Sequence, residues 1–360
     1  MHSLTVGGGD CIFIRTSQDN SPRKVITMMK KPSSDLKLSS ASQSSGGSTR
    51  REFLKGAAVV AATTLATPIM SKAAEPNLVP TVDFCGHKVT RLLAGANPLY
   101  GYSHFNIIMD ATYLEYFTDE RVVQFMLNCE KAGINSWQGN FAARAQRQYP
   151  MIRDAGCKMN FIALSDPWDF NSRAKTAVDQ SDAVMKQLST VAKAKPIIIA
   201  HHGNVTDNLY REGKLDLVRT FLDKVHDLGF PAGVSTHNPA VIVEIEEKGW
   251  PVDFYQACFY RVSRNAEDYQ RDINVVPEGE GYLSTDPPVM CKVIRQVSKP
   301  CLGFKILAAG RKCTSPESIR QAFKFAYENI KPTDVLIVGM FPKYKDQIGE
   351  NTWYARQFAA

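Results

Sequence analysis

Polar side chains follow several short apolar segments of this sequence, in places where acid–base chemistry on a small molecule would need them. Histidine, lysine, tyrosine and aspartate are side chains that move protons or hold a carbonyl oxygen in enzyme sites. Four of the seven histidines lie just after predicted strands, and four such residues on one rim favour a site over isolated structural roles. The catalytic candidates are Tyr100, Tyr102, His104, Asp166, His201 and Lys305.

A divalent metal is an alternative use of the same residue types. Imidazole and carboxylate groups are metal ligands, and His201, His237 and Asp166 would form the set. The sequence has no HxH or HExxH spacing to support it. Because adjacent residues on a strand point to opposite faces, only one of His201 and His202 would face a site. Lys305 would act as a base or a Schiff-base amine if it is desolvated.

The elements that must position these residues alternate between short apolar runs and amphipathic stretches. The pattern predicts strands at 89–96, 134–137, 158–164, 196–200, 232–235, 252–257, 301–307 and 335–338. It predicts helices at 118–132, 142–155, 173–194, 215–228, 239–248, 289–297, 315–330 and 345–356. Eight such units in a row indicate a single (β/α)8 TIM barrel at 75–360, with its site on the loops that follow the strands. The long loop 259–288 is expected to be a lid or a disordered segment.

The N-terminal part of the chain predicts an export signal. Arg50 and Arg51 precede Phe53-Leu54 and a weakly apolar, alanine-rich run, and Ser71-Lys72-Ala73 is a small-x-small cleavage pattern. Residues 48–74 therefore resemble a twin-arginine (Tat) signal peptide, and the apolar run is shorter than the ~20 residues that span a membrane. We expect a periplasmic or secreted protein that meets the Tat machinery and keeps no membrane anchor after cleavage. Residues 1–47 have a disordered composition, with a possible true start at Met28 or Met29.

Composition excludes some classes of partner. Of the 43 basic and 36 acidic residues, ten and four lie in residues 1–74, which leaves 33 basic and 32 acidic residues in the predicted barrel. A nearly neutral barrel gives no reason to expect nucleic-acid binding. The seven cysteines after the leader form no CxxC pair, so buried thiols are expected rather than a disulfide framework or a zinc site.

Several segments resemble the aldo-keto reductase superfamily. Segment 233–239 (GVSTHNP) is similar to a family segment whose serine contacts the nicotinamide amide, and Gln256 is placed like a second amide contact. Phe304 falls near the aromatic residue that stacks on the nicotinamide ring. Segments 93–99 and 132–135 resemble the family's first strand and second-strand entry, and 337–340 and 347–351 resemble the stretch that holds the adenosine phosphate. The resemblance implies NAD(P)(H) binding through Ser235, Asn238, Gln256, Phe304, Lys343, Gln347, Glu350 and Asn351.

The family's catalytic residues are not kept. The positions of its Asp, Tyr and Lys fall on Gln138, Ala143 and near Ser165 or Asp166, and only the histidine has a match, at His201. The resemblance therefore implies an oxidoreductase with a rebuilt proton donor. The candidates for that donor are Tyr100, Tyr102, His104 and Lys305.

Three functions follow from these patterns. The first is an exported aldo-keto-reductase-like oxidoreductase that acts on a small carbonyl or sugar-type substrate with NAD(P)(H). The second is a metal-dependent or lysine-based sugar isomerase, epimerase or lyase on the same barrel. The third is a carbohydrate-binding barrel without catalysis, in which aromatic residues form stacking platforms. Those residues would be Tyr100, Tyr102, Trp137 and Trp168.

Overall fold

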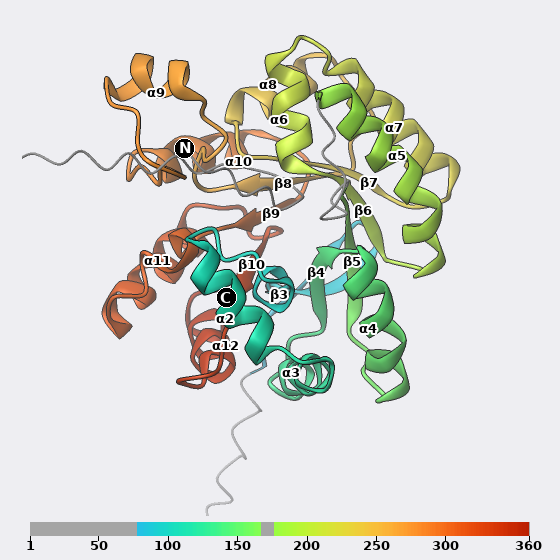
Figure 1. Ribbon diagram of the computed structural model, residues 1–360, viewed down its shortest axis with the longest axis vertical. Helices are drawn as coiled ribbons and strands as arrows, with labels where there is room; N and C mark the ends of the chain where they lie inside the picture. The colour runs from blue at the N-terminus through green and yellow to red at the C-terminus, as the bar shows by residue number, and fades with distance from the viewer. Residues whose placement is uncertain (1–77, 167–175, 360) are drawn as a thin grey trace, which may run out of the picture. The chain divides into compact units, whose positions relative to one another are not determined.

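The computed structural model describes residues 78–166 and 176–359, and within them eight parallel strands close into a barrel. The order around the barrel is β10, β3, β4, β5, β6, β7, β8, β9, so β10 closes onto β3 (Figure 1). The barrel strands are β3 (Leu92–Gly95), β4 (Ser136–Asn140), β5 (Asn160–Ser165), β6 (Ile198–His201), β7 (Ala232–Thr236), β8 (Phe254–Cys258), β9 (Cys301–Phe304) and β10 (Val335–Gly339). The (β/α)8 barrel predicted from strand–helix alternation is confirmed.

Most helices cover the outside of the barrel, whereas α2 and α9 belong to the loops after β3 and β8 (Figure 1). The helices are α2 (Ile107–Tyr116), α3 (Asp119–Lys131), α4 (Ala143–Asp154), α5 (Ala177–Lys193), α6 (Gly203–Arg211), α7 (Asp216–Asp227), α8 (Pro239–Glu247), α9 (Ala266–Ile273), α10 (Asp286–Gln296), α11 (Pro316–Glu328) and α12 (Gln347–Phe358). Side chains fix where several of them begin. Thr118 caps α3, and Thr176 and Asp179 form a reciprocal capping box on α5. The eight predicted helices are present, with ends that differ by a few residues.

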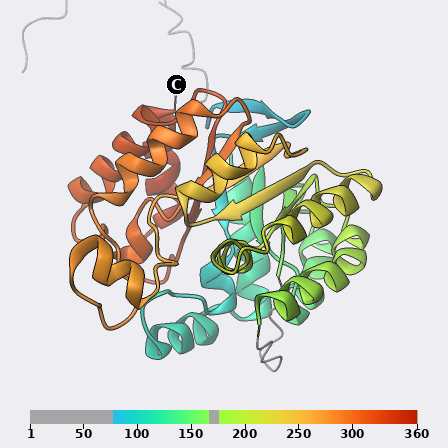
Figure 2. The ribbon, with the colours of Figure 1, turned by 90° about the horizontal axis from the view of Figure 1, so that it is seen from above.

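The first predicted strand, 89–96, is two strands, and that prediction was wrong. β2 (His87–Thr90) pairs antiparallel with β1 (Thr81–Phe84), and the chain turns at Arg91 before β3 enters the barrel. Cys85 and Gly86 have φ values of 51° and 79°, the left-handed pair that a two-residue hairpin turn requires. Phe84 packs edge-on against Phe254 at 5.7 Å. The hairpin thereby closes the amino end of the barrel, opposite to α2 (Figure 2).

Three helices were not predicted: α2, α6 and α9. α2 buries none of its residues, so it carries no apolar stripe for a sequence pattern to reveal. α9 lies inside the long loop 259–288, which is ordered by ion pairs. Arg264 bonds Asp286 at 2.7 Å and Asp272 at 2.9 Å. The loop is thus an ordered part of the structure beside the barrel.

The barrel interior is apolar near the hairpin and polar at the opposite end. One buried cluster joins Phe84 of the hairpin to Leu93, Ile162, Phe254 and other inward residues of the strands. Gly233 makes room for Phe254, because a Cβ at that glycine would lie 2.3 Å from the ring. The carboxyl ends of the strands carry the polar residues that the sequence singled out.

Some predictions fall outside the described residues. The leader at 48–74, the extension at 1–47 and Trp168 are among them, so export stays a prediction. Within 78–166 and 176–359, no helix has the length and apolarity needed to cross a membrane. The described cysteines are free thiols, and five of the seven are buried, as expected.

Candidate functional site

The carboxyl ends of the barrel strands form a polar mouth. Ser165 donates to the carbonyl of Val184 on α5, so it faces outward, and Asp166, the next residue, faces the mouth. The same alternation brings Asn140, His202 and His237 to the mouth from neighbouring strands. Asn140 Nδ2 donates to Asp166 Oδ2 at 3.0 Å, which joins the ends of β4 and β5.

His237 and Asp207 form a buried dyad at the mouth. His237 Nδ1 lies 2.9 Å from Asp207 Oδ2, and Asp207 also accepts from the His237 backbone N at 3.0 Å and from Thr236 Oγ1 at 2.5 Å. The carboxylate can only accept a hydrogen bond, so the neutral ring carries its proton on Nδ1. The lone pair of Nε2 is then available. Nε2 has no hydrogen-bond partner in the described ranges. The ring packs beside Phe304 at 5.4 Å, on the inner side of the mouth.

Asp207 was missed by the sequence analysis. It lies on α6, four residues beyond Gly203, and a Cβ at Gly203 would sit 3.0 Å from both Ser235 Oγ and His237 Cε1. The glycine lets α6 approach β7 closely enough for Asp207 to reach His237. No sequence signal marks this aspartate, because its partner lies 30 positions away.

His202, not His201, faces the mouth. Its Nε2 lies 3.8 Å from Asp166 Oδ2, and burial lowers its pKa despite the nearby carboxylates of Asp166 and Asp207. Its Nδ1 is buried without a hydrogen-bond partner in the part of the chain that the structure describes. A buried polar atom without a partner is costly, so it marks a position where a ligand or water would bond.

His201 lies on the outer side of β6. Its ring packs edge-on against Phe221 of α7 at 4.9 Å, and its Nδ1 lies 2.7 Å from Thr206 Oγ1. Burial lowers its pKa to about 3, so it stays neutral at physiological pH. The position is that of a packing residue, and the structure does not bring His201 together with the other candidates.

Lys305 stands at the end of β9 with its backbone in the left-handed region, at φ 59°. Such a conformation in a non-glycine residue is strained and is found preferentially at functional sites. Burial lowers the pKa of its ammonium, and the charge of Glu280 only partly offsets this. Nζ lies 5.8 Å from the centroid of the Phe304 ring. No carboxylate of the described residues lies within ion-pair distance of Nζ.

His104 joins two loops over the mouth. Its Nδ1 lies 2.8 Å from Glu280 Oε1 in the long loop, and its Nε2 lies 3.2 Å from Asn97 Nδ2. Burial and Lys305 lower the pKa of His104, so the neutral ring donates to Glu280 and accepts from Asn97. Burial would raise the pKa of Glu280, but the interactions with His104, Lys305 and Tyr282 together outweigh it and lower the pKa to about 2.

Arg311, in the loop after β9, adds to this clasp, by which we mean the contact between His104 and Glu280. Its guanidinium stacks over Tyr282 at 4.1 Å and over Phe105 at 5.4 Å, and Tyr282 donates to Glu280 Oε2 at 2.9 Å. The long loop therefore covers part of the mouth. Glu280, Tyr282 and Arg311 were not predicted as site residues, because their contacts depend on how three loops meet.

The two tyrosines differ in position. Tyr100 is buried, and burial raises its pKa beyond any useful range for an acid at neutral pH. Tyr102 is half-buried at the mouth, where burial and the charge of Asp166 raise its pKa while a hydrogen bond with Asn140 opposes the shift. Tyr102 is thus placed to hydrogen-bond a ligand in its neutral form. Trp137 is buried and stacks on Phe161 at 5.2 Å, so it is a core residue and no platform.

Part of the set expected to bind nicotinamide lies together. Ser235 and Gln256 are paired across β7 and β8, and both are buried. Gln256 Oε1 is buried without a hydrogen-bond partner among the described residues. Phe304 lies at the mouth. Asn238 instead caps α8, where its Oδ1 accepts from the backbone N of Ala240 at 3.1 Å.

Two of the four residues expected to hold the adenosine phosphate are engaged elsewhere. Gln347 Oε1 accepts from the backbone N of Phe341 at 2.7 Å, and Glu350 pairs with Lys345 at 2.7 Å. The other two expected residues are the buried Asn351 and the exposed Lys343.

The metal hypothesis gains no support from this geometry. Within residues 78–166 and 176–359, no three histidine, cysteine, aspartate or glutamate side chains are grouped so that they could hold a metal ion. Of the expected ligands, His237 is committed to Asp207, and His201 faces α7 rather than Asp166.

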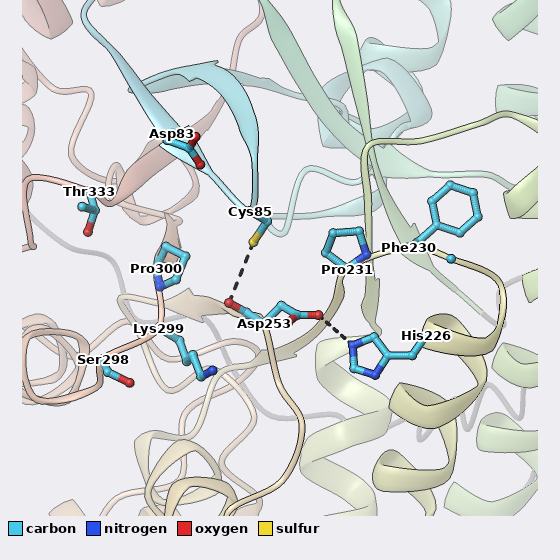
Figure 3. Close-up of a pocket in the computed structure, with 11 residues that line it drawn as sticks. Asp83, Cys85, His226, Phe230, Pro231, Asp253, Ser298, Lys299, Pro300 and Thr333 are labelled. Atoms are coloured by element: carbon cyan, nitrogen blue, oxygen red, sulfur yellow. Dashed lines mark hydrogen bonds and ion pairs between the residues drawn. The ribbon is translucent and has the colours of Figure 1, made fainter.

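A hollow of about 720 Å³ lies at the other end of the barrel, beneath the hairpin (Figure 3). Asp253 is at its centre, where Oδ2 accepts from His226 Nε2 and from the backbone N of Ala232, each at 2.7 Å. Cys85 Sγ lies 3.8 Å from the Asp253 carbonyl. These contacts tie α7 and the hairpin to the strand starts, at the barrel face that usually serves stability. The hollow is separate from the polar mouth.

Comparisons with known proteins give the fold context. No family model and no curated protein matches this sequence. Solved structures with a similar fold include a truncated 3-deoxy-D-arabino-heptulosonate 7-phosphate synthase from Thermotoga maritima, at 12% identity and TM-score 0.44 over 79% of this chain and 91% of that chain. The glycerol dehydrogenase AKR11B4 from Gluconobacter oxydans matches at 11% identity and TM-score 0.41, over 72% and 86%. The aldo-keto reductase AKR11C1 from Bacillus halodurans matches at 12% and 0.34, over 78% and 94%. Structural neighbours thus include aldo-keto reductases among barrels of other activities, and they assign no activity to this chain.

Proposed function

We propose that this protein is an enzyme that moves a proton next to the carbonyl group of a small polar compound, as isomerases, epimerases and lyases do. The observation that carries the proposal is the dyad of His237 and Asp207 at the mouth. The carboxylate fixes the ring and its tautomer, and Nε2 is left without a partner in the described ranges. A histidine oriented by a carboxylate in this way is placed to act as a general base.

Lys305 supplies the second function of the site. An enolate that forms beside a carbonyl needs positive charge or a hydrogen-bond donor near its oxygen. Lys305 stands close enough to His104, His202 and Glu280 for its charge to influence their titration. Its amino group would therefore supply that hydrogen-bond donor.

The polar residues on the opposite strands would hold the substrate. Asn140, Asp166 and Tyr102 form a connected group, and His202 Nδ1 is a buried atom without a partner among the described residues. Such donors and acceptors suit hydroxyl groups on a compound of sugar type. The clasp between His104 and Glu280 would exclude water from one side.

Deuterium exchange tests the proposal without a known product. Purified protein is incubated in D2O with dihydroxyacetone, glyceraldehyde and hydroxyacetone, and loss of the proton beside the carbonyl is followed by NMR. We expect enzyme-dependent exchange that falls by roughly 10²–10⁴-fold in His237→Gln, the range for removal of a general base. His226→Gln, at the far end of the barrel, is the matched control. Exchange that is absent, or that is equal in the two variants, contradicts the proposal.

A nicotinamide-dependent oxidoreductase of the aldo-keto reductase type is the second candidate. Gln256 Oε1 is a buried acceptor without a partner in the described ranges, beside Ser235, and it would accept a hydrogen bond from the nicotinamide amide. When bound, NAD(P)(H) would supply hydride, while Lys305 would hold a proton at Nζ. Titration with NADPH, followed by its fluorescence, decides this reading. We expect Gln256→Ala to weaken binding and the exposed Gln321→Ala not to; absence of binding contradicts the candidate.

A further inference from the structure

Lys305 and Lys299 are partly buried and have no carboxylate within ion-pair distance among the described residues. Lys299 lines the hollow at the other end of the barrel, so Lys305 is the lysine with these properties at the mouth. Lys331 is also sheltered, but its Nζ lies 3.2 Å from Asp334. Lys345 pairs with Glu350 at 2.7 Å. Burying an ammonium without a partner costs free energy, which favours the neutral amine. A neutral amine is a nucleophile, and a paired ammonium is not.

The loop that carries this amine has an unusual backbone conformation. Lys305 follows the last residue of β9 with φ 59°, and Ala308, Ala309 and Gly310 in the same loop also have positive φ. Strain of this kind persists only when the surrounding structure holds it. The loop is held by Arg311, which donates to the carbonyls of His104 and Ala308, each at 3.3 Å.

We propose that Lys305 bonds covalently to its substrate, which is therefore an aldehyde or a ketone. The inference rests on the proposed function and names the substrate class of the same site. The Lys305 amine adds to the carbonyl carbon, and the carbinolamine loses its oxygen as water to leave a C=N bond. The protonated imine withdraws electrons from the adjacent C–H bond, and His237 Nε2 takes that proton. Returning the proton to another carbon or face, followed by hydrolysis, releases the product and restores both residues.

Two further groups have positions that suit these reaction steps. The carbinolamine oxygen needs a proton to leave as water, and His202, whose Nε2 lies 3.8 Å from Asp166 Oδ2, lies at the same mouth. The carboxylate of Glu280 is held by His104 and Tyr282 close enough to influence Lys305. It would stabilise the positive charge of the protonated imine.

Reductive trapping tests the inference. The full-length protein is incubated at pH 7 with glyceraldehyde, dihydroxyacetone or pyruvate and sodium cyanoborohydride, and each modified lysine is located by peptide mass spectrometry. The exposed Lys343 is the internal control for ordinary lysine reactivity. Because burial lowers the pKa of the Lys305 ammonium, a larger fraction of it is free amine at pH 7, and we expect Lys305 to be modified faster than Lys343. Lys305→Arg removes that adduct and leaves the one at Lys343.

Each outcome separates the inference from the proposed function. Modification of Lys343 and other exposed lysines without Lys305, for all three probes, overturns the inference. If deuterium exchange still depends on His237 in that case, the proposed function stands and the substrate is held without a covalent bond. If Lys305 is trapped but exchange does not depend on His237, the imine is real and the proposed base is wrong. Thermal unfolding of Lys305→Arg and of Lys305→Gln confirms that the variants are folded.

Discussion

Replacing Asp207 removes the acceptor around which one side of the mouth is built. Its two oxygens accept three hydrogen bonds, from Thr236 Oγ1, from the His237 backbone N and from His237 Nδ1. Asp207, Thr236 and His237 are all buried. In Asp207→Ala, Thr236 keeps an acceptor in the Asn238 carbonyl at 3.2 Å, but the two donors of His237 lose theirs. In Asp207→Asn, the amide oxygen can still accept from both His237 donors.

These differences set the expected loss in the free energy of unfolding for each variant. A buried donor left without an acceptor costs ~1–3 kcal/mol, so two such donors, with the lost charge-assisted bond of Thr236, lower the free energy of unfolding by about 4 kcal/mol in Asp207→Ala. Asp207→Asn keeps the shape and loses only the charge, so its cost is about 1–2 kcal/mol. The alanine variant is therefore expected to be less stable than the asparagine variant by about 2–3 kcal/mol.

Urea unfolding followed by circular dichroism and by tryptophan fluorescence measures both variants, and coincident transitions justify a two-state treatment. Asp227→Ala is the control, because that side chain is 67% exposed and its one ion pair among the described residues is with Lys224, at 3.4 Å. It should change the free energy of unfolding by less than about 1 kcal/mol. The reasoning is refuted if Asp207→Ala unfolds like Asp227→Ala, or if the alanine and asparagine variants are equally stable.

Three further outcomes are expected. Gly233→Ala places a Cβ 2.3 Å from the Phe254 ring and should cost about 3 kcal/mol, and Phe254→Leu should recover part of it; a double-mutant cycle with zero coupling would contradict this. Burial raises the pKa of the Cys258 thiol to about 12, so iodoacetamide at pH 7 should label the exposed Cys313 in the folded protein and Cys258 only after unfolding, as peptide mapping would show. Burial would raise the pKa of Asp207, but the hydrogen bonds that it accepts outweigh this and lower it. The charged Asp207 therefore contributes fully to stability above pH ~4, and this contribution is lost as pH falls through the lower folded-state pKa. The difference in free energy of unfolding between the wild-type protein and Asp207→Asn should shrink in acid. A difference that stays constant with pH would be inconsistent with the dyad.

The predicted ends of strands and helices agree with the structure where apolar runs are bounded by turn residues. β7, β10, α7, α8 and α11 agree with their predicted ranges to within two residues. The error at β2 and β3 has a local cause. Arg91 interrupts an otherwise apolar run, and its guanidinium donates to the carbonyls of Asp334, Lys331 and Ala359, more than 200 positions away. No short window of sequence contains those partners.

The site could be predicted as a region but not as a set of contacts. Asp166, Tyr102, His104 and Lys305 do lie at the mouth, because residues after parallel strands share one end of a barrel. The sequence predicted Glu280 only as part of a polar loop, because its partner His104 is 176 positions away.

By itself, the sequence determined the order of strands and helices, because each element's apolar period is a local property. Only the tertiary structure decided which of His201 and His202 faces the mouth. A shift of one residue in a strand moves every side chain to the opposite face, and strand ends read from sequence are uncertain by more than that. The pairing of His237 with Asp207 was likewise decided by the closing of the barrel. That closure brings α6 against β7, and the charge, tautomer and reactivity of the mouth depend on it.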